Sequence, residues 1–241
     1  MLKHYLNTTY EDEMNVKLIS YSQQAIDADK QDEFEFDLPN LQDLVAYCAR
    51  VSNPSNQANS ETSEKLIKYL IKHKHWSPLE MVSACIEVET TRDIARQLLR
   101  HRSFSFQEFS QRYADPTQEL DFVVREARLQ DTKNRQNSIR TEDIELQTRW
   151  ALMQKRVIDE AKYVYKWAID NGIAKEQARA VLPEGNTVSR LYVNGTLRSW
   201  IHYIDLRDGN GTQEEHAEIA RACANVIAKV FPIIKSIREG T

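Results

Sequence analysis

The sequence predicts an α+β fold in which a single domain, residues 1–241, combines a few strands with several long helices. Short β-branched segments with alternating apolar residues are typical of strands, and longer segments with apolar residues every three or four positions are typical of helices. The chain contains both kinds. It has no internal repeat and no interior linker, and 241 residues can enclose a substantial core.

Three segments are expected to be strands, at residues 16–21, 81–89 and 187–193. In the second strand, alternation places four apolar side chains on one face: Val82, Ala84, Ile86 and Val88. The dipeptide Asn194-Gly195 follows the third segment. Because Asn-Gly is typical of tight turns, we expect a turn there.

The first three expected helices are identified by apolar spacing and by their caps. One covers residues 38–52, and the next ends at residue 72 and begins at a cap, Ser60 or Thr62. A third helix, TRDIARQLLR, is capped by Thr90 or Thr91.

The second half of the chain is expected to be mainly helical after residues 115–140, a polar segment that should cross the surface. A long helix over 141–170 has an apolar stripe of Trp150, Met153, Val157, Ala161, Val164 and Ala168. Further helices are expected in KEQARAVLP, which ends before Pro183, in TLRSWIHYIDLR from Thr196, and over 212–238 with an interruption near Pro232.

Charge is distributed unevenly along the chain. The net charge is −4 and the pI about 5.9, so general attraction to nucleic acid is not expected. Between Arg92 and Arg112, however, five arginines face only two acidic residues, a local excess of +3. A local positive patch on an acidic chain favours a small anionic ligand over a long polyanion.

The three cysteines, Cys48, Cys85 and Cys223, are widely spaced and form no CxxC pair. They indicate neither a disulfide framework nor a zinc site, and each is expected to be a buried, small apolar residue. No signal peptide and no apolar run of about 20 residues is present, so no membrane association is expected. The expected location is a reducing cytoplasm.

Residues 100–113, RHRSFSFQEFSQRY, are the most informative part of the sequence. Arginine offers a rigid fork of donors that suits phosphates and the edges of heterocycles, and this segment uses arginine as its only cation. The segment therefore predicts a pocket for an anionic, planar ligand such as a nucleotide.

Several residues around this segment allow two interpretations. Arg92, Arg96 and Arg100 recur every four positions, as expected for either a solvated helix face or a cationic edge that points into a cleft. His101 lies between two arginines, which should lower its pKa and leave a neutral imidazole. Glu108 could balance charge, accept a sugar hydroxyl or organise Arg112.

Other candidate groups lie outside the segment. Arg179 and Arg207 each adjoin apolar residues and could be ion-pair partners or anion clamps. His73 and His75 lack a third ligand nearby, so no metal site is expected. The glycine patterns of dinucleotide and phosphate loops are absent, as is the Gly-x-Ser-x-Gly elbow of hydrolases.

The chain resembles the flavin-dependent thymidylate synthases. Arg100-His101-Arg102, followed after seven residues by Ser110, matches the RHR-x7-S pattern of that family, and the similarity extends over YCARVS, LIKYLIKHKHWSPLE, QARAVLP and RSWIHYIDLR. The resemblance implies the thymidylate synthase-complementing fold with an antiparallel sheet. It also implies an enzyme that methylates dUMP to dTMP, with 5,10-methylenetetrahydrofolate as carbon donor, reduced FAD as hydride donor and NADPH as reductant.

The resemblance further implies a homotetramer with FAD sites shared between subunits, and it assigns roles by position. Arg207 would be catalytic by stabilising charge on the uracil. FAD would contact Ser77, Arg100, His101, Arg102, Glu108, Arg198 and His202. The dUMP site would contain Gln97, Arg100, Glu108, Phe109, Ser110, Gln111, Arg112, Arg179 and Arg207. His75 and Tyr113 would lie near the folate and flavin face.

This chain departs from the family pattern at a few positions: many relatives have Gly at Gln111, Asn at His202 and His at Met81. Two other functions are open to the sequence. One is a module that binds a nucleotide or flavin without turnover. The other is an RNA-binding protein with Phe104, Phe106 and Phe109 as stacking platforms.

Overall fold

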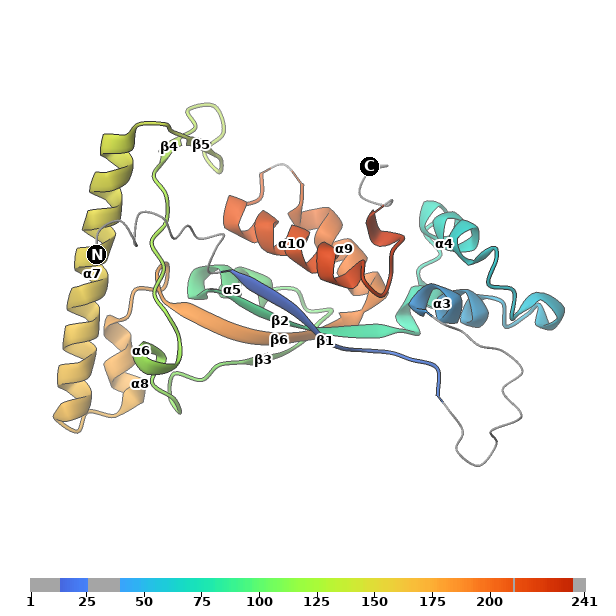
Figure 1. The fold of residues 1–241 in the computed structure, drawn as a ribbon, viewed down its shortest axis with the longest axis horizontal. Coiled ribbons are helices and arrows are strands. Elements are labelled where there is room, and N and C mark those ends of the chain that lie inside the picture. Colours follow the sequence, from blue (N-terminus) through green and yellow to red (C-terminus); the bar gives the residue numbers. More distant parts are fainter. Residues whose placement is uncertain (1–13, 26–39, 210, 236–241) are drawn as a thin grey trace.

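The computed structural model describes residues 14–25, 40–209 and 211–235. Its centre is an antiparallel sheet of four strands, in the spatial order β1 (Asn15–Tyr21), β2 (Ser83–Thr91), β6 (Val188–Thr196) and β3 (Ser105–Glu108). Helices lie above this sheet and at both of its ends (Figure 1). The predicted α+β class and the antiparallel sheet are confirmed.

The three predicted strands are all present, but the predicted turn at Asn194-Gly195 is wrong. β6 continues through both residues, and Gly195 pairs with Ala84 of β2. A Cβ atom at Gly195 would lie 2.3 Å from Cδ1 of Phe104. The glycine therefore allows the Phe104 ring to lie against the strand. This requirement comes from tertiary packing and cannot be recognised from the Asn-Gly dipeptide alone.

The helices around the sheet begin close to the predicted caps. At α3 and α9 the cap side chain bonds the helix, since Asn40 accepts from the Asp43 N–H and Thr196 from the Ser199 N–H. The bounds of this group are α3 (Leu41–Ala49), η1 (Pro54–Asn56), α4 (Ser63–Lys72), η2 (Ser77–Glu80), α5 (Arg92–Leu98), α9 (Leu197–Arg207) and α10 (Glu214–Ile227).

Two predicted caps are in place but use their hydroxyls elsewhere. Thr62 precedes α4 and accepts a hydrogen bond from Arg50 Nη2 at 2.8 Å. Thr91 precedes α5 and bonds Oδ1 of Asp93 at 2.6 Å. The last predicted helix is shorter than expected, because α10 ends at Ile227 before Pro232; residues 236–238 of that prediction lie outside the described residues.

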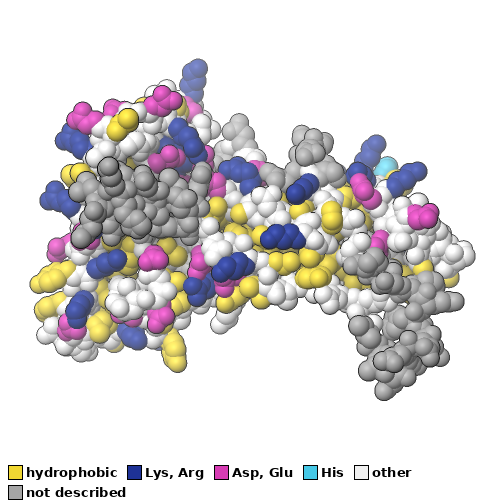
Figure 2. Space-filling view, in the orientation of Figure 1, with side chains coloured by type: hydrophobic (Ala, Val, Ile, Leu, Met, Phe, Trp, Pro, Cys, Tyr) yellow, Lys and Arg dark blue, Asp and Glu magenta, His cyan; other side chains and the backbone are white. Residues whose placement is uncertain are grey.

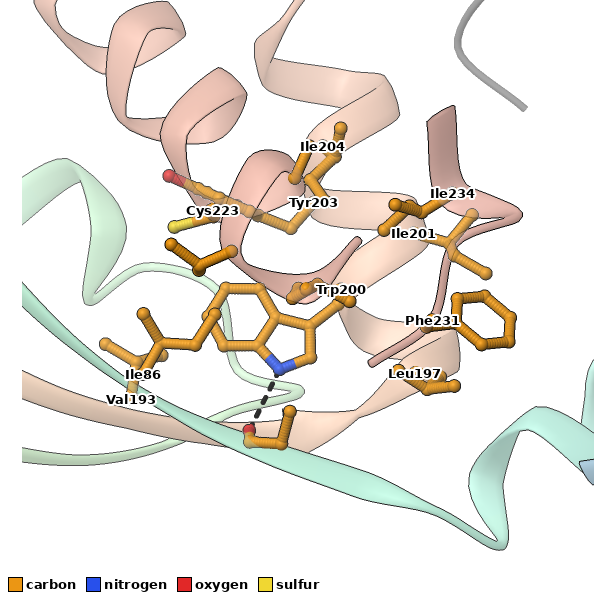
Figure 3. Packing of buried hydrophobic residues seen from close by; sticks show 14 of the residues in the cluster. Ile86, Val193, Leu197, Trp200, Ile201, Tyr203, Ile204, Cys223, Phe231 and Ile234 are labelled. Carbon is orange, nitrogen blue, oxygen red and sulfur yellow. Dashed lines mark hydrogen bonds between the residues drawn. The ribbon is translucent and has the colours of Figure 1, made fainter. Parts of the chain in front are cut away.

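The core lies between one face of the sheet and the helices α5, α9 and α10. Trp200 of α9 is fully buried, and its Nε1 donates to the Ala84 carbonyl at 3.0 Å (Figure 3). Burying a side chain of this size stabilises the fold by about 5 kcal/mol before the entropy cost is counted. Val82, Ala84, Ile86 and Val88 all face this core, as predicted, with exposures of 0–1 %.

The opposite face of the sheet is largely polar and carries ion pairs. Lys17 bonds Glu87 at 3.3 Å, and Arg190 bonds Glu89 at 2.6 Å, each across neighbouring strands. The sheet is thus covered by helices on one side only, which fixes the orientation of α5 and α9, the two helices that bear candidate site residues.

The polar segment 115–140 is more ordered than its sequence suggested. It contains a short helix, α6 (Pro116–Glu119), and a hairpin of β4 (Arg128–Gln130) and β5 (Ser138–Arg140). After the hairpin the chain forms α7 (Ile144–Asp170), α8 (Lys175–Ala178) and η3 (Arg179–Val181), at the end of the sheet opposite α3 and α4 (Figure 1).

The six residues of the stripe predicted on α7 divide between two faces. Ala161 and Ala168 are buried, but Trp150, Met153 and Val157 are 44–54 % exposed. The inner face also contains Gln154, whose side chain bonds both the N–H and the carbonyl of Arg125, together with Ile158 and Tyr165. Apolar side chains are visible on the surface at this end of the molecule (Figure 2).

The described residues include no helix that is long and apolar enough to cross a membrane.

Candidate functional site

Residues 100–113 form two turns separated by a strand that the sequence analysis missed. Arg100, His101 and Arg102 lie in the turn after α5, β3 covers Ser105–Glu108, and Ser110 begins the second turn. A strand of four residues is about 13 Å long. The arginines of the two turns therefore lie at opposite ends of β3.

His101 and Arg207 form the contact that joins this segment to a distant part of the chain. Arg207 at the end of α9 donates through Nε to Nε2 of His101 at 2.9 Å. Burial, and then the charge of Arg207, lower the pKa of His101 to about 4. The prediction of a neutral imidazole is confirmed, although the main causes are burial and Arg207, not the neighbouring arginines.

Gln97 contacts residues of α10 that sequence reasoning did not select. Its Nε2 donates to Oε1 of Gln213 at 2.8 Å, and its Oε1 lies 3.3 Å from Nδ1 of His216. His216 is fully buried, and its ring centroid lies 6.2 Å from that of His101. Burial, Arg207 and His101 lower its pKa to about 3. Nothing in the local sequence distinguishes His216 from a structural histidine.

The three arginines of the predicted row differ in exposure, since Arg92 lies inside the fold while Arg96 and Arg100, the latter just beyond α5, are exposed. Arg92 is buried and lies 3.6 Å from Glu108 and 3.1 Å from Glu184. Arg96 bonds the other oxygen of Glu108 at 2.9 Å, and Ser189 donates to Glu108 at 3.0 Å. Glu108 therefore balances charge, one of its three predicted roles, and it does not organise Arg112, which pairs with Glu176 at 3.2 Å.

Four arginines of the predicted site keep uncompensated charges. Within the described part of the chain, Arg100, Arg102, Arg179 and Arg207 make no ion pair, whereas Arg198 is compensated by Glu80 at 2.6 Å. Free guanidinium groups are suited to phosphate. Arg100 and Arg102, on either side of His101, therefore fit the diphosphate of a dinucleotide such as FAD better than Arg198 does.

The second turn combines exposed and buried side chains. Ser110 is exposed and Tyr113 is 86 % exposed, while Gln111 is buried with no hydrogen-bond partner for Nε2 among the described residues. A buried amide nitrogen without an acceptor is costly, so a ligand oxygen at this position would stabilise the turn. Phe109 packs against the small cluster of Leu120, Val123 and Val188, and its N–H donates to the Arg190 carbonyl at 2.9 Å.

The remaining predicted residues lie on α9 and on the segment that leads from α4 to η2. His202 packs edge-on against Trp76, with ring centroids 4.4 Å apart, and Ser77 begins η2 next to that ring. His75 follows Lys74, which has φ +58° and lies just beyond the C-cap of α4. The N–H groups of Lys74 and His75 bond back to the carbonyls of Ile71 and Leu70, a Schellman motif that fixes where His75 leaves the helix.

The contacts therefore join some predicted residues and leave others apart. Gln97, His101 and Arg207 belong to one group. His75, Ser77, Arg198 and His202 lie apart from it: along α9, Arg198 is about 13 Å and His202 about 8 Å from Arg207. Arg179, in η3, contacts neither group. Among the described residues, no set of three His, Cys, Asp or Glu side chains could hold a metal ion.

One cavity adjoins this site. It has a volume of about 850 Å³ and lies between the β4–β5 hairpin and the chain that links α9 to α10. Gln213 lines the cavity and also bonds Gln97, so the cavity and the candidate site share a wall.

Phe104 does not support the RNA-binding alternative. It is 8 % exposed, and its ring packs against Trp200 with centroids 4.5 Å apart. A side chain enclosed in this way cannot serve as a platform for an incoming base.

Comparison with known proteins places the chain in a family. Residues 36–233 match the family model described as "Thymidylate synthase complementing protein". The chain is 46 % identical over 221 residues to a probable flavin-dependent thymidylate synthase of Paramecium bursaria Chlorella virus 1, covering 92 % of this chain and 97 % of that protein. It is 48 % identical over 196 residues to the flavin-dependent thymidylate synthase of Synechocystis sp., covering 81 % and 88 %.

The chain belongs to the flavin-dependent thymidylate synthase family. Solved structures agree with this assignment. A UMP/dUMP methylase, PolB from Streptomyces cacaoi, bound with 5-Br dUMP, has a TM-score of 0.72 at 28 % identity, with 92 % of each chain covered. The same methylase bound with 5-Br UMP also has a TM-score of 0.72, at 27 % identity, with 90 % of this chain and 89 % of that chain covered. The family resemblance and the fold implied by it are confirmed.

Because the half-buried His101 and the buried His216 have lowered pKa values, stability should fall in mildly acidic solution. In the unfolded chain each would titrate near 6.5, but in the fold near 4 and 3. Between these values the unfolded chain binds protons that the folded chain does not. The free energy of unfolding should therefore be constant above about pH 7 and decrease as pH falls from 7 to 5.

Chemical denaturation measured at pH 7, 6 and 5 tests this expectation. His216→Asn removes one titrating group, so its midpoint should decrease less steeply than that of the wild type. Equal slopes for the two proteins would mean that His216 is not buried in its neutral form.

Proposed function

We propose that this chain methylates dUMP to dTMP, using 5,10-methylenetetrahydrofolate as carbon donor and NADPH as the source of reducing equivalents. The observation that supports this most directly is the 2.9 Å contact between Arg207 Nε and His101 Nε2. It joins the Arg100-His101-Arg102 segment to the end of the RSWIHYIDLR helix, and it leaves both terminal nitrogens of Arg207 available to a ligand. The whole chain, residues 1–241, would form one catalytic domain.

Arg207 acts electrostatically in this proposal. When the uracil N3 loses its proton, negative charge develops on the ring, and a fixed guanidinium stabilises that charge without forming a covalent bond. His101 is neutral and accepts from Nε, so it holds the guanidinium in place without competing for its charge.

The other substrate contacts are proposed from the chemistry of dUMP. Its phosphate needs several strong donors, which Ser110, Arg112 and the uncompensated Arg179 offer. The buried amide nitrogen of Gln111 needs an acceptor, and the nucleotide would supply one. Phe109 supports the turn that presents these groups. Glu108 and Gln97 line the same site.

FAD would be held mainly by Arg100 and Arg102, whose free charges suit its diphosphate, with Ser77 and, on α9, Arg198 and His202 as further contacts. When bound, the flavin supplies the hydride that reduces the transferred carbon. The exposed side chains of His75 and Tyr113 would lie near the folate and flavin face.

Turnover can be tested by release of tritium from 5-tritiated dUMP in the presence of methylenetetrahydrofolate, NADPH and FAD. Release that depends on the protein and on each of these three additions is expected. A folded sample that binds flavin but releases no tritium would contradict the proposal and favour a binding module.

A homotetramer with shared FAD sites is also proposed, and the outer face of α7 supports it. Along the outer face of α7, four large apolar side chains are 44–54 % exposed: Trp150, Met153, Val157 and Trp167. A contiguous apolar patch on a protein surface is typical of a site that contacts another protein. Val157→Glu places a charge in the middle of this face. Sedimentation should then detect smaller particles than for the wild type, and an unchanged mass would exclude α7 from the interface.

The cysteines are not needed for this chemistry. Cys223 is fully buried, and burial raises the pKa of the Cys48, Cys85 and Cys223 thiols, which disfavours a thiolate nucleophile. We also propose a reducing cytoplasm as the location of these free thiols. Replacing all three with alanine should leave turnover intact in the tritium assay. Loss of turnover, with folding and flavin binding retained, would contradict this expectation.

A further inference from the structure

Four polar side chains near the start of α10 form a continuous chain of hydrogen bonds that includes Gln97. Glu215 Oε2 accepts from Gln213 Nε2 at 3.0 Å, and Gln213 Oε1 accepts from Gln97 Nε2 at 2.8 Å. Gln97 Oε1 then lies 3.3 Å from His216 Nδ1. Glu215 and His216 are both buried.

The chemistry of Glu215 determines the direction of every bond in this chain. A carboxylate can only accept, so Gln213 must present its amide nitrogen to Glu215 and its oxygen to Gln97. Gln97 must then present its nitrogen to Gln213 and its oxygen to His216. His216 must consequently carry its hydrogen on Nδ1. Its Nε2, which is buried and has no partner among the described residues, is left with no hydrogen to donate.

Glu215 is itself held by the hairpin. Arg128 of β4 forms an ion pair with Glu215 and a second with Glu214 at 2.9 Å. The Glu215 side chain is 5 % exposed and the Arg128 side chain 11 % exposed, so both charges are largely removed from water. Each side chain therefore compensates the charge of the other. The segment 115–140 thereby connects to Gln97 through α10.

We propose that Glu215 is a positioning residue: it sets the direction of this hydrogen-bond chain and so orients the Gln97 amide toward the nucleotide. The inference rests on the proposed function, because it takes the nucleotide to be the ligand of Gln97. With its direction fixed, Gln97 has one N–H and one oxygen lone pair left for that ligand. A rotated amide would present the opposite pattern.

Glu215→Gln tests the direction of the chain while preserving side-chain shape. The new carboxamide can donate as well as accept, so Gln213 and Gln97 can rotate and His216 can take either tautomer. The readout is the ¹⁵N spectrum of His216 at neutral pH. In the wild type we expect hydrogen on Nδ1 alone, and in Glu215→Gln a mixture of tautomers. Hydrogen on Nε2 in the wild type would overturn the proposal.

Glu214→Gln is the matched control. Glu214 pairs with the same Arg128 and also with Arg140 at 2.6 Å, but it bonds no member of the amide chain. It should leave the His216 tautomer unchanged. A tautomer shift in this control would show that loss of charge, and not loss of direction, controls His216.

The functional step is tested by steady-state kinetics. Glu215→Gln should raise KM for dUMP up to about tenfold, with a smaller change in kcat, as expected for one misdirected hydrogen bond. In a Gln97→Leu background, Glu215→Gln should change KM no further. A tautomer shift with unchanged KM, or additive effects in the double variant, would overturn the positioning role. If the wild type lacks turnover, the proposed function fails, while the ¹⁵N result still decides the direction of the chain.

Discussion

Gly195→Ala should destabilise the protein by about 1–3 kcal/mol, because the added methyl group meets a ring that has little space to move. The new Cβ would lie 2.3 and 2.5 Å from Cδ1 and Cε1 of Phe104. Phe104 cannot shift freely, since its ring packs against Trp200 and lies 5.8 Å from that of Tyr203. The denaturant midpoint measures this loss.

The same change should weaken flavin and nucleotide binding. Phe104 lies two residues after Arg102, and its N–H donates to the His101 carbonyl at 3.2 Å. Displacing the ring therefore moves the turn that contains the free arginines. Flavin retention during gel filtration, measured at a temperature where the variant is folded, tests this effect.

Gly185→Ala is the control for the general effect on stability of replacing a glycine with alanine. Its new Cβ would meet only Arg125 Nη1, at 4.0 Å, so stability should be unchanged or slightly raised. Phe104→Leu combined with Gly195→Ala should be less destabilising than the sum of the two changes, since the smaller side chain leaves room. If Gly195→Ala is as stable as Gly185→Ala, the ring does not lie against β6.

The elements that could be predicted from sequence are those specified by local patterns. Alternation identified β2 and its buried face, and spacing with caps identified α3, α4 and α9. Gly195 was misinterpreted because Asn-Gly is a strong turn pattern, and the reason for the glycine is a ring from a distant segment. β3 was missed because its four residues, SFQE, give too short an alternation.

The candidate site also contains some residues that local patterns can identify and others that depend on tertiary packing. Local composition predicted a segment for an anionic ligand at residues 100–113 and selected Arg179 and Arg207 as possible anion clamps, and the family pattern gave each of them a role. Neither could identify the His101–Arg207 contact, since two polar residues on different elements meet only through tertiary packing. Glu215 and His216 belong to an ordinary amphipathic helix, so their roles depend on which residues α10 contacts.

Arg207→Leu should lower kcat about 10²–10³-fold with a smaller effect on dUMP binding, as expected when a donor that stabilises developing charge is removed. Arg207→Lys should restore little of this loss. A lysine has one cationic nitrogen, so it cannot both bond Nε2 of His101 and present a fork of donors to the uracil. Tritium release and equilibrium dUMP binding separate the two effects, and a change in affinity alone would make Arg207 a binding residue only.

The Arg207–His101 contact predicts a second result that does not depend on turnover. The charge of Arg207 is one of the two causes that hold the pKa of His101 at about 4, so its removal should raise that pKa. Histidine NMR signals followed between pH 4 and 8 measure the change.

Arg221→Leu is the control, because Arg221 pairs with Asp208 at 3.1 Å in the adjoining loop. This variant should leave both kcat and the His101 titration unchanged. If the pKa of His101 is the same in Arg207→Leu as in the wild type, the two side chains do not meet, and the electrostatic role of Arg207 loses the contact that positions it.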